Sequence, residues 1–134
     1  LEDAFLIFAV PVFTESLRHK QTTPKKIYAI DNGLVLANTF NLSENLGKLL
    51  ENQVYLDLRR EGKKIFYYQT SDGYEIDFIT EDSKGNHEML QVVWDINDQK
   101  TFERETRALK QAESELGFSG KLIDYKDYLQ KMTY

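Results

Sequence analysis

The strongest constraint on the fold is a succession of three strand patterns in the middle of the chain, at residues 65–69, 74–80 and 88–94. The first two are rich in aromatic and β-branched residues and are separated by the turn sequence Ser71-Asp72-Gly73, which predicts an antiparallel hairpin. The third run is almost entirely apolar, as is typical of a strand that is covered on both faces. We therefore expect a sheet with the third strand in its interior.

Two helix patterns flank these strands. A leucine or valine recurs every four residues from Leu46 to Leu58, which predicts a helix over residues 44–61. A second amphipathic pattern predicts a helix over residues 98–116, followed by a last strand at 121–125. Because a strand–helix–strand crossover joins parallel strands, the last strand is expected to run parallel to the third. The order α-β-β-β-α-β predicts an α/β fold with a mixed central sheet flanked by helices.

The first forty residues are less regular. The apolar run at residues 4–13 predicts a strand or a buried extended segment, and the polar stretch 14–24 predicts a loop. A short strand is expected at residues 26–30, and a short helix at 33–39 after an Asp-Asn-Gly turn.

The composition excludes several classes of protein. The chain of 134 residues has no cysteine, so it holds neither a disulfide nor a cysteine-ligated metal. No apolar run approaches the ~20 residues that span a bilayer, and no signal-peptide pattern opens the chain, so no membrane partner is expected. The sequence begins without a Met, like a cut through a longer protein. We expect one compact, soluble domain in the cytoplasm.

A local basic cluster stands against a net charge of -5. Affinity for nucleic acid comes mostly from Lys and Arg that neutralise phosphates, so the acidic balance argues against it, although a local patch can suffice. Arg59, Arg60, Lys63 and Lys64 form such a patch and are the candidate nucleic-acid-binding residues. The alternative is an ordinary solvated surface at the end of a helix.

Three polar residues lie in otherwise apolar patterns. Glu51 is at the margin of the apolar stripe of the first long helix. Asp77 is in the middle of a strand, where alternation places it on one face with Glu75 and Ile79. Gln91 is in the middle of the third strand. Carboxylates brought together from a helix and a strand could hold a divalent cation such as Mg²⁺, with Glu51 and Asp77 as ligands. The alternative for each is a surface ion pair or a turn cap.

Several motifs resemble those of the C-terminal domain found in a large group of prokaryotic AAA-type ATPases. They occur in the same order and span about residues 4–126. The matching segments are KIYAIDNGL at residues 26–34, ENLGKLLENQV at 44–54, DGYEIDFI at 72–79, LQV at 90–92 and RE at 104–105. That domain is similar to the PD-(D/E)xK restriction-endonuclease-like fold, whose α-β-β-β-α-β core agrees with the predicted element order.

The resemblance implies a set of nuclease residues, carried over one by one. Glu51 matches the helix acid, Asp77 the metal-bridging acid and Gln91 the second acidic position of the catalytic motif. The motif lysine falls at Val93, which cannot polarise an attacking water, and Gln91 brings no charge to a cation. We therefore expect at most a weak Mg²⁺ site and an impaired catalytic centre, unless Lys64 or another base acts from a different element.

The resemblance also implies a longer protein, with a P-loop ATPase and a winged-helix segment before this domain. Residues 1–24 are then the tail of that linker or winged-helix region, and residues 25–134 are the endonuclease-like domain. The chain has no G-x-x-x-x-G-K-[ST] loop, so no ATP site is expected in it.

Three functions remain open at this point. The first is a catalytically impaired nuclease-like module that binds DNA or a protein. The second is a Mg²⁺-dependent nuclease with an altered motif, and the third is a structural regulator that docks onto the ATPase of the same chain.

Overall fold

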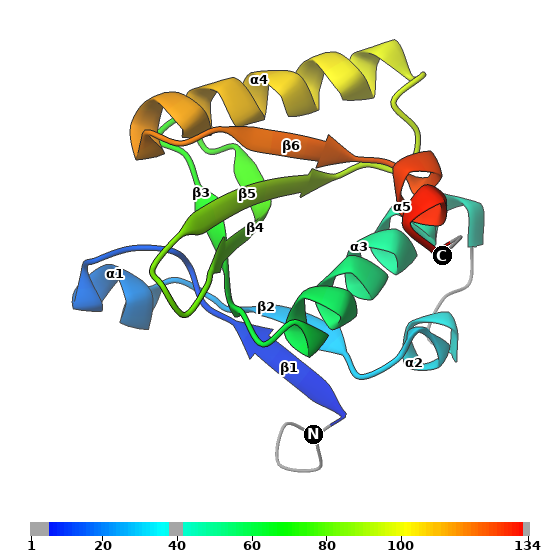
Figure 1. Ribbon diagram of the computed structural model, residues 1–134, viewed down its shortest axis with the longest axis horizontal. Coiled ribbons are helices and arrows are strands. Elements are labelled where there is room, and N and C mark those ends of the chain that lie inside the picture. Colours follow the sequence, from blue (N-terminus) through cyan, green and yellow to red (C-terminus); the bar gives the residue numbers. More distant parts are fainter. Residues whose placement is uncertain (1–5, 38–41, 133–134) are drawn as a thin grey trace.

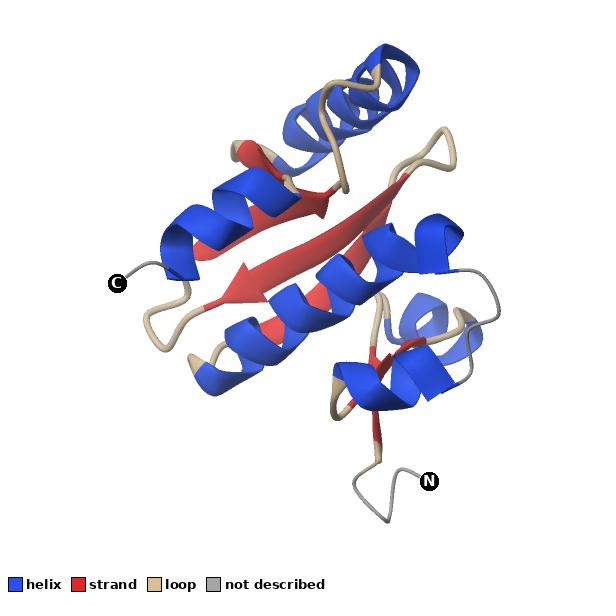
Figure 2. Cartoon of the chain, turned by 90° about the vertical axis from the view of Figure 1, so that its right-hand side faces the viewer, coloured by secondary structure: helices blue, strands red, loops and turns tan. Residues whose placement is uncertain are grey.

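The computed structural model describes residues 6–37 and 42–132 and is an α/β structure with a mixed four-stranded sheet between two long helices (Figure 1). In chain order its elements are β1 (Ile7–Val10), α1 (Leu17–Thr22), β2 (Lys26–Ala29), α2 (Asn32–Ala37), α3 (Leu42–Arg60), β3 (Lys64–Gln69), β4 (Glu75–Glu81), β5 (His87–Val92), α4 (Gln99–Leu116), β6 (Gly120–Ile123) and α5 (Tyr125–Met132). Helix α3 covers one face of the sheet and α4 covers the other (Figure 2). No helix in these residues is both long and apolar enough to cross a bilayer.

The sheet has the strand order β3-β4-β5-β6. β3 pairs with β4 and β4 with β5 in antiparallel register, whereas β6 runs parallel to β5 after the crossover through α4. The predicted hairpin, the interior position of the third strand and the parallel last strand are all confirmed. The mixed α/β architecture follows from these pairings.

The two long helices confirm the apolar periodicity. α3 begins two residues before its predicted start and ends one residue before its predicted end. α4 begins after Asp98, whose carboxylate accepts from Lys100 N and Thr101 N, and it ends at Gly117, whose φ of 82° is one that glycine adopts without strain.

The region before residue 25 contains more structure than the polar sequence suggested. Strand β1 pairs antiparallel with β2, and Val10 and Val12 are buried in the main core. The prediction of a loop over residues 14–24 is wrong in part, because α1 forms there with Ser16 Oγ accepting from His19 N at 3.2 Å. None of the residues of α1 is buried, so no apolar period marked it.

The short helix expected at residues 33–39 is present as α2, and the end of that range lies outside the described residues. The amphipathic tail that begins at Tyr125, for which the sequence allows a short helix or a packing strand, forms helix α5. This helix follows β6 directly and packs on the α3 side through Tyr125 and Tyr128.

A β-bulge in β4 decides where its side chains point. Phe66 pairs with Ile79 but Tyr68 pairs with Ile76, so β4 carries one extra residue opposite β3. Ile76 and Ile79 therefore both pack on the α4 side, while Phe78 packs on the α3 side. The prediction that Asp77 shares a face with Ile79 is wrong for this reason: its carboxylate reaches side chains on the α3 side.

Candidate functional site

The candidate site is a cluster of three carboxylates around the ammonium of Lys26. Lys26 Nζ lies 2.7 Å from Glu51 Oε1, 2.9 Å from Glu75 Oε1 and 3.3 Å from Asp77 Oδ1. These four residues come from β2, α3 and β4 and are called the Lys26 cluster below. The fold thus brings Glu51 and Asp77 together, as the sequence predicted, and adds a cation between them.

Two hydrogen bonds from the side-chain amide of Asn52 hold helix α3 in place for this contact. Asn52 is buried, and its side chain accepts from Ala29 N at 2.8 Å and donates to Ala29 O at 3.2 Å. This pair of bonds ties the middle of α3 to the end of β2. Glu51 therefore faces Lys26, and it also accepts a 2.6 Å hydrogen bond from Tyr28 Oη.

The position of Asp77 follows from the bulge. Its Oδ2 accepts from Val92 N at 2.9 Å, at the place where β4 and β5 separate, and its Oδ1 faces Lys26. Burial raises the pKa of Asp77 from its ordinary value of 3.8 to about 7, and the neighbouring charge of Glu51 adds to this effect. Asp77 consequently titrates near neutral pH.

Burial and charge oppose each other at Lys26 but act in the same direction at the neighbouring Tyr28. Burial alone would lower the pKa of Lys26, but the charges of Asp77 and Glu51 outweigh it and raise this pKa. The pKa of Tyr28 is raised by burial and by the charge of Glu51. Because both pKa values are raised, Lys26 remains a cation at neutral pH, and Tyr28 keeps its proton and donates it in the hydrogen bond to Glu51.

Gln91 does not join the carboxylates. Its Oε1 accepts from Asp77 N at 2.8 Å, and its Nε2 donates to Glu75 O at 3.1 Å and to Glu105 Oε2 on α4. The side chain thus bridges the main chain of β4 to α4, and none of its polar atoms is directed at the Lys26 ammonium. It holds β4 at the bulge and so positions Asp77.

The polar residues of this region that sequence reasoning did not name as site residues are Lys26, Tyr28, Asn52, Glu75 and Glu105. Val93, where the resemblance places the motif lysine, is buried, and its N–H donates to Ile123 O at 2.9 Å. The ammonium comes instead from Lys26, the first residue of the KIYAIDNGL motif. That motif was a signal in the sequence, but nothing in it indicated which side chains it would meet.

The charges of the Lys26 cluster bear on metal binding. Carboxylate oxygens are the ligands that Mg²⁺ prefers, but here the ammonium lies where such an ion would contact Glu51 and Asp77. Within residues 6–37 and 42–132, no three Asp, Glu or His side chains are grouped to hold a metal ion as they stand. In this arrangement the residues do not fit a metal, and Lys26 is the cation at the carboxylates.

A cavity of about 790 Å³ opens onto Lys26, Glu51 and Glu75.

The basic candidates lie in the last turn of α3 and just after it. Arg59, Arg60 and Lys63 line one groove, and Lys64 is not among its lining residues. Most of these charges have acidic neighbours. The ion pairs join Arg60 to Asp57 at 3.0 Å, Lys63 to Glu61 at 3.1 Å and to Glu88 at 3.6 Å, and Lys64 to Glu81 at 3.9 Å. Only part of the expected positive patch is available to phosphate.

Comparison with known proteins gives a family without an assigned activity. The model of the family described as a domain of unknown function, DUF4143, matches residues 46–131, more than half of the chain. The chain belongs to this family. The matched range holds Glu51, Asp77 and Gln91, whereas Lys26 lies before it.

One curated relative matches most of the chain. It is the uncharacterized protein MJ1544 of Methanocaldococcus jannaschii, which is 35% identical over 132 residues. The alignment covers 93% of this chain but only 28% of that protein, so the chain spans less than a third of its relative. No solved structure matches.

Proposed function

We propose that this chain is a nuclease-like module of a prokaryotic AAA-type ATPase and that it acts by binding a partner rather than by cutting nucleic acid. The observation that carries the proposal is the ammonium of Lys26 in contact with three carboxylates, two of them at the positions of the metal-binding acids. A nuclease of this kind needs a divalent cation there to stabilise charge on the phosphate.

The nuclease-like part of the proposal is supported by the element order and by the placement of the acids. An α-β-β-β-α-β order with a mixed sheet is present, and the helix acid meets the hairpin acid on one side of it. The ATPase part rests on the motif resemblance and on a relative far longer than this chain. The ATPase and winged-helix segments of the same protein are its first proposed partners, and the cytoplasm is the proposed compartment.

The impaired chemistry follows from electrostatics. A divalent ion would have to displace Lys26 from partly buried positions, where the side chains of Lys26 and Glu51 are only 20% and 21% exposed. The displaced ammonium would lose its charged partners, and breaking such a pair is costly. A metal ion therefore competes with a cation that is covalently tethered beside the site.

The test is a cleavage assay on the purified chain with supercoiled DNA, single-stranded DNA and RNA, each with Mg²⁺ and with Mn²⁺. We expect no cleavage above that of Asp77→Asn, which lacks the ionisable acid. Metal-dependent cleavage that disappears in Asp77→Asn and survives in Asp72→Asn, an exposed turn residue, would overturn the proposal.

A second candidate function, a metal-dependent nuclease with an altered motif, is favoured by one observation. The ammonium that is missing at Val93 is supplied beside the same acids by Lys26. If Lys26 takes the role of the motif lysine, Lys26→Met should abolish cleavage together with Glu51→Gln and Asp77→Asn. If Lys26 only blocks the site, Lys26→Met should leave the protein inactive or create metal-dependent cleavage that the unaltered chain lacks.

The link to an ATPase needs the longer protein. We expect the rate of ATP hydrolysis of the full-length protein to change when the segment corresponding to residues 1–134 is deleted. We expect no ATP hydrolysis by the isolated chain, which has no P-loop. An unchanged rate in the deletion variant would contradict a regulatory role.

A further inference from the structure

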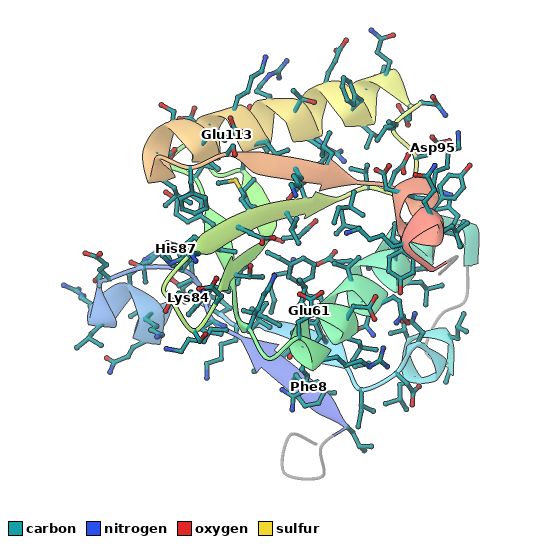
Figure 3. All side chains as sticks on the ribbon, viewed as in Figure 1. Phe8, Glu61, Lys84, His87, Asp95 and Glu113 are labelled. Atoms are coloured by element: carbon teal, nitrogen blue, oxygen red, sulfur yellow. The ribbon has the colours of Figure 1, made fainter. Side chains whose placement is uncertain are left out.

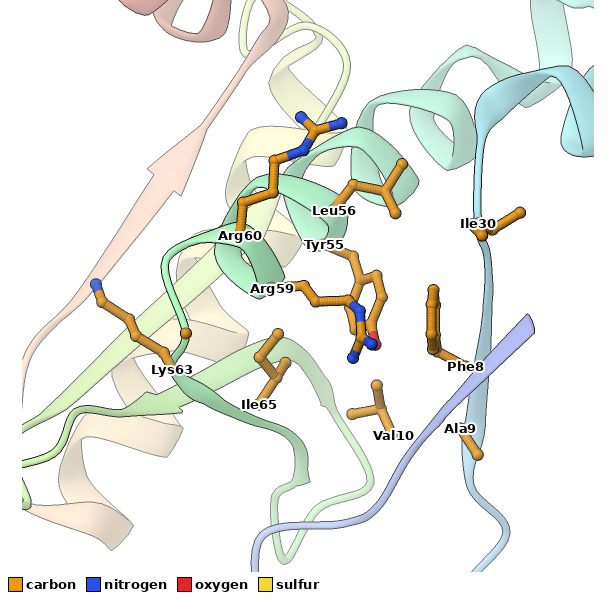
Figure 4. A pocket seen from close by; sticks show the side chains of 11 residues that line it. Phe8, Ala9, Val10, Ile30, Tyr55, Leu56, Arg59, Arg60, Lys63 and Ile65 are labelled. Carbon is orange, nitrogen blue, oxygen red and sulfur yellow. The ribbon is translucent and has the colours of Figure 1, made fainter. Parts of the chain in front are cut away.

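A groove of about 850 Å³ lies between β1 and the beginning of β3, beside the last turn of α3 (Figure 4). It is called the Arg59 groove below. Its apolar lining comes from Phe8 and Val10 on β1, Tyr55 and Leu56 on α3, and Ile65 on β3. The groove is separate from the Lys26 cluster, because none of the four cluster residues lines it.

The groove exists because, within the described residues, β3 pairs at one point with the segment that follows β1 and not with β1 itself. Tyr67 N donates to Pro11 O at 3.1 Å, and Phe13 N donates to Tyr67 O at 2.7 Å. Before this bridge the two strands belong to different sheets, and in the described residues no further pairing joins them. Strand β1 thus has one edge on β2 and one edge on the groove.

The alternation of a strand shows which groups lie on the groove edge. In β1 the main-chain groups of successive residues point to opposite edges. Leu6 O accepts from Ile30 N on the β2 side, and beyond the strand Pro11 O and Phe13 N face β3. The N–H and C=O groups of Ile7 and Ala9 therefore point to the same side, away from β2. By the same rule, the main-chain groups of Ile65 point from β3 toward the groove.

The charge in the groove comes from Arg59. Its guanidinium carbon stands 3.9 Å from the centre of the Phe8 ring, and it hangs from α3 into the groove between Tyr55 and Phe8 (Figure 4). Within the described part of the chain, no carboxylate lies within ion-pair distance of Arg59, in contrast to Arg60 and Lys63 beside it. The groove therefore combines an open strand edge, an apolar lining and one cation without an acidic neighbour.

We propose that the Arg59 groove binds an extended peptide of a partner protein, which adds a strand to the free edge of β1 and places an acidic side chain at Arg59. Strand addition supplies main-chain hydrogen bonds to Ile7 and Ala9, and the alternate side chains of the peptide reach the apolar lining. A carboxylate at a guanidinium adds a strong and directional contact.

A nucleic acid fits the same groove less well. Phosphate binding depends on several free cations along a surface, and three of the four basic candidates face acids of this chain. A phosphodiester backbone cannot pair with a strand edge as a peptide does, and its charged phosphates gain little from an apolar lining. An extended peptide can form main-chain hydrogen bonds with the edge and bury apolar side chains against the lining. This inference rests on the binding role proposed above but not on the state of the Lys26 cluster.

The test uses a labelled peptide of alternating valine and glutamate and a second peptide with glutamine in place of glutamate. We expect the purified chain to bind the first about tenfold more tightly than the second, because one ionic hydrogen bond is lost. Arg59→Gln should remove this preference. Lys84→Gln, in the turn between β4 and β5 (Figure 3), is the matched control and should keep it.

The position of the peptide is tested without altering the protein. Amide hydrogen exchange at Ile7 and Ala9 should slow when the peptide binds. A peptide N-methylated at alternate residues, which cannot complete the main-chain pairing, should lose affinity. The proposal is wrong if these amides are unchanged, if both peptides bind equally, or if neither binds. It is also wrong if duplex DNA binds through Arg59 and displaces the peptide. Cleavage assays do not enter this test, so its failure is distinct from that of the proposed catalytic impairment.

Discussion

The Lys26 cluster and the Arg59 groove are two charged regions, one beside the middle of α3 and one beside its last turn, and their cations have different surroundings. Lys26 is partly buried and contacts three carboxylates of its own chain. Arg59 is exposed and lies over an aromatic ring, with no acid of the described residues beside it. The cation of the Lys26 cluster is paired with acids of the same chain, whereas the cation of the Arg59 groove is open to an acid of a partner.

The difference illustrates how burial governs the use of charge. A charge removed from water must be paired, because its desolvation is expensive, so Lys26 and its acids are linked to one another. An exposed guanidinium remains hydrated and can form a new ion pair at little cost. The Lys26 cluster is thus expected to matter for stability, and the Arg59 groove for recognition.

The largest expected effect comes from removing the cation of the Lys26 cluster. Lys26→Met leaves Glu51, Glu75 and Asp77 without a counter-charge, and breaking a buried pair in this way costs about 3 to 5 kcal/mol. Urea unfolding should show this loss, whereas Lys84→Met should change stability by less than about 0.5 kcal/mol. Similar losses in the two variants would show that the ion pairs of the Lys26 cluster contribute no more to stability than an exposed surface residue does.

A smaller effect concerns pH and Asp77. Burial raises the pKa of Asp77 to about 7, so the folded state binds a proton that the unfolded chain, with a pKa near 3.8, releases. Its contribution to stability therefore falls as pH rises from about 4 to about 7, by an amount on the order of 3 kcal/mol. The Asp77→Asn side chain cannot ionise, so the variant should not lose this stability. The difference between the unfolding free energy of the variant and that of the unaltered chain should therefore grow as pH rises over this range.

The control for the pH experiment is Asp72→Asn, since Asp72 is an exposed residue in the turn between β3 and β4. Its stability curve should run parallel to that of the unaltered chain. Parallel curves for Asp77→Asn as well would mean that Asp77 is ionised in the folded state at all these pH values. The contrast between a desolvated and a solvated charged region would then be lost.

The smallest expected effect is on the groove side. Arg59→Gln removes an exposed contact between a cation and the Phe8 ring, which is worth about 0.5 to 1 kcal/mol. Thermal unfolding should detect a change no larger than this. A loss comparable to that of Lys26→Met would show that Arg59 is a structural residue. It would argue against a role of Arg59 in recognition.

Much of the fold could be predicted because it follows from local patterns. The four-residue apolar repeat of α3, the Ser71-Asp72-Gly73 turn and the crossover through α4 each depend on residues that are close in sequence. Helix α1 escaped prediction because its residues are all partly or fully exposed and form no apolar stripe. The nearness of Glu51 and Asp77 followed from the element order together with the resemblance.

The site itself required tertiary structure. Lys26 meets Glu51 and Asp77 across 25 and 51 positions of sequence, and this contact depends on the packing of β2 against α3. The bulge in β4 breaks the two-residue alternation, so the direction of Asp77 could not be inferred from its neighbours.

The sequence by itself therefore predicted the two long helices, the central hairpin and the parallel last strand, because short-range sterics and the burial of apolar periods set these. The motif resemblance added two of the acids. Only the tertiary structure decided that an ammonium from β2 would be the cation at those acids. Only it separated β1 from β3 to leave an open edge at Arg59. Both outcomes are set by contacts between distant segments, which no local pattern of residues specifies.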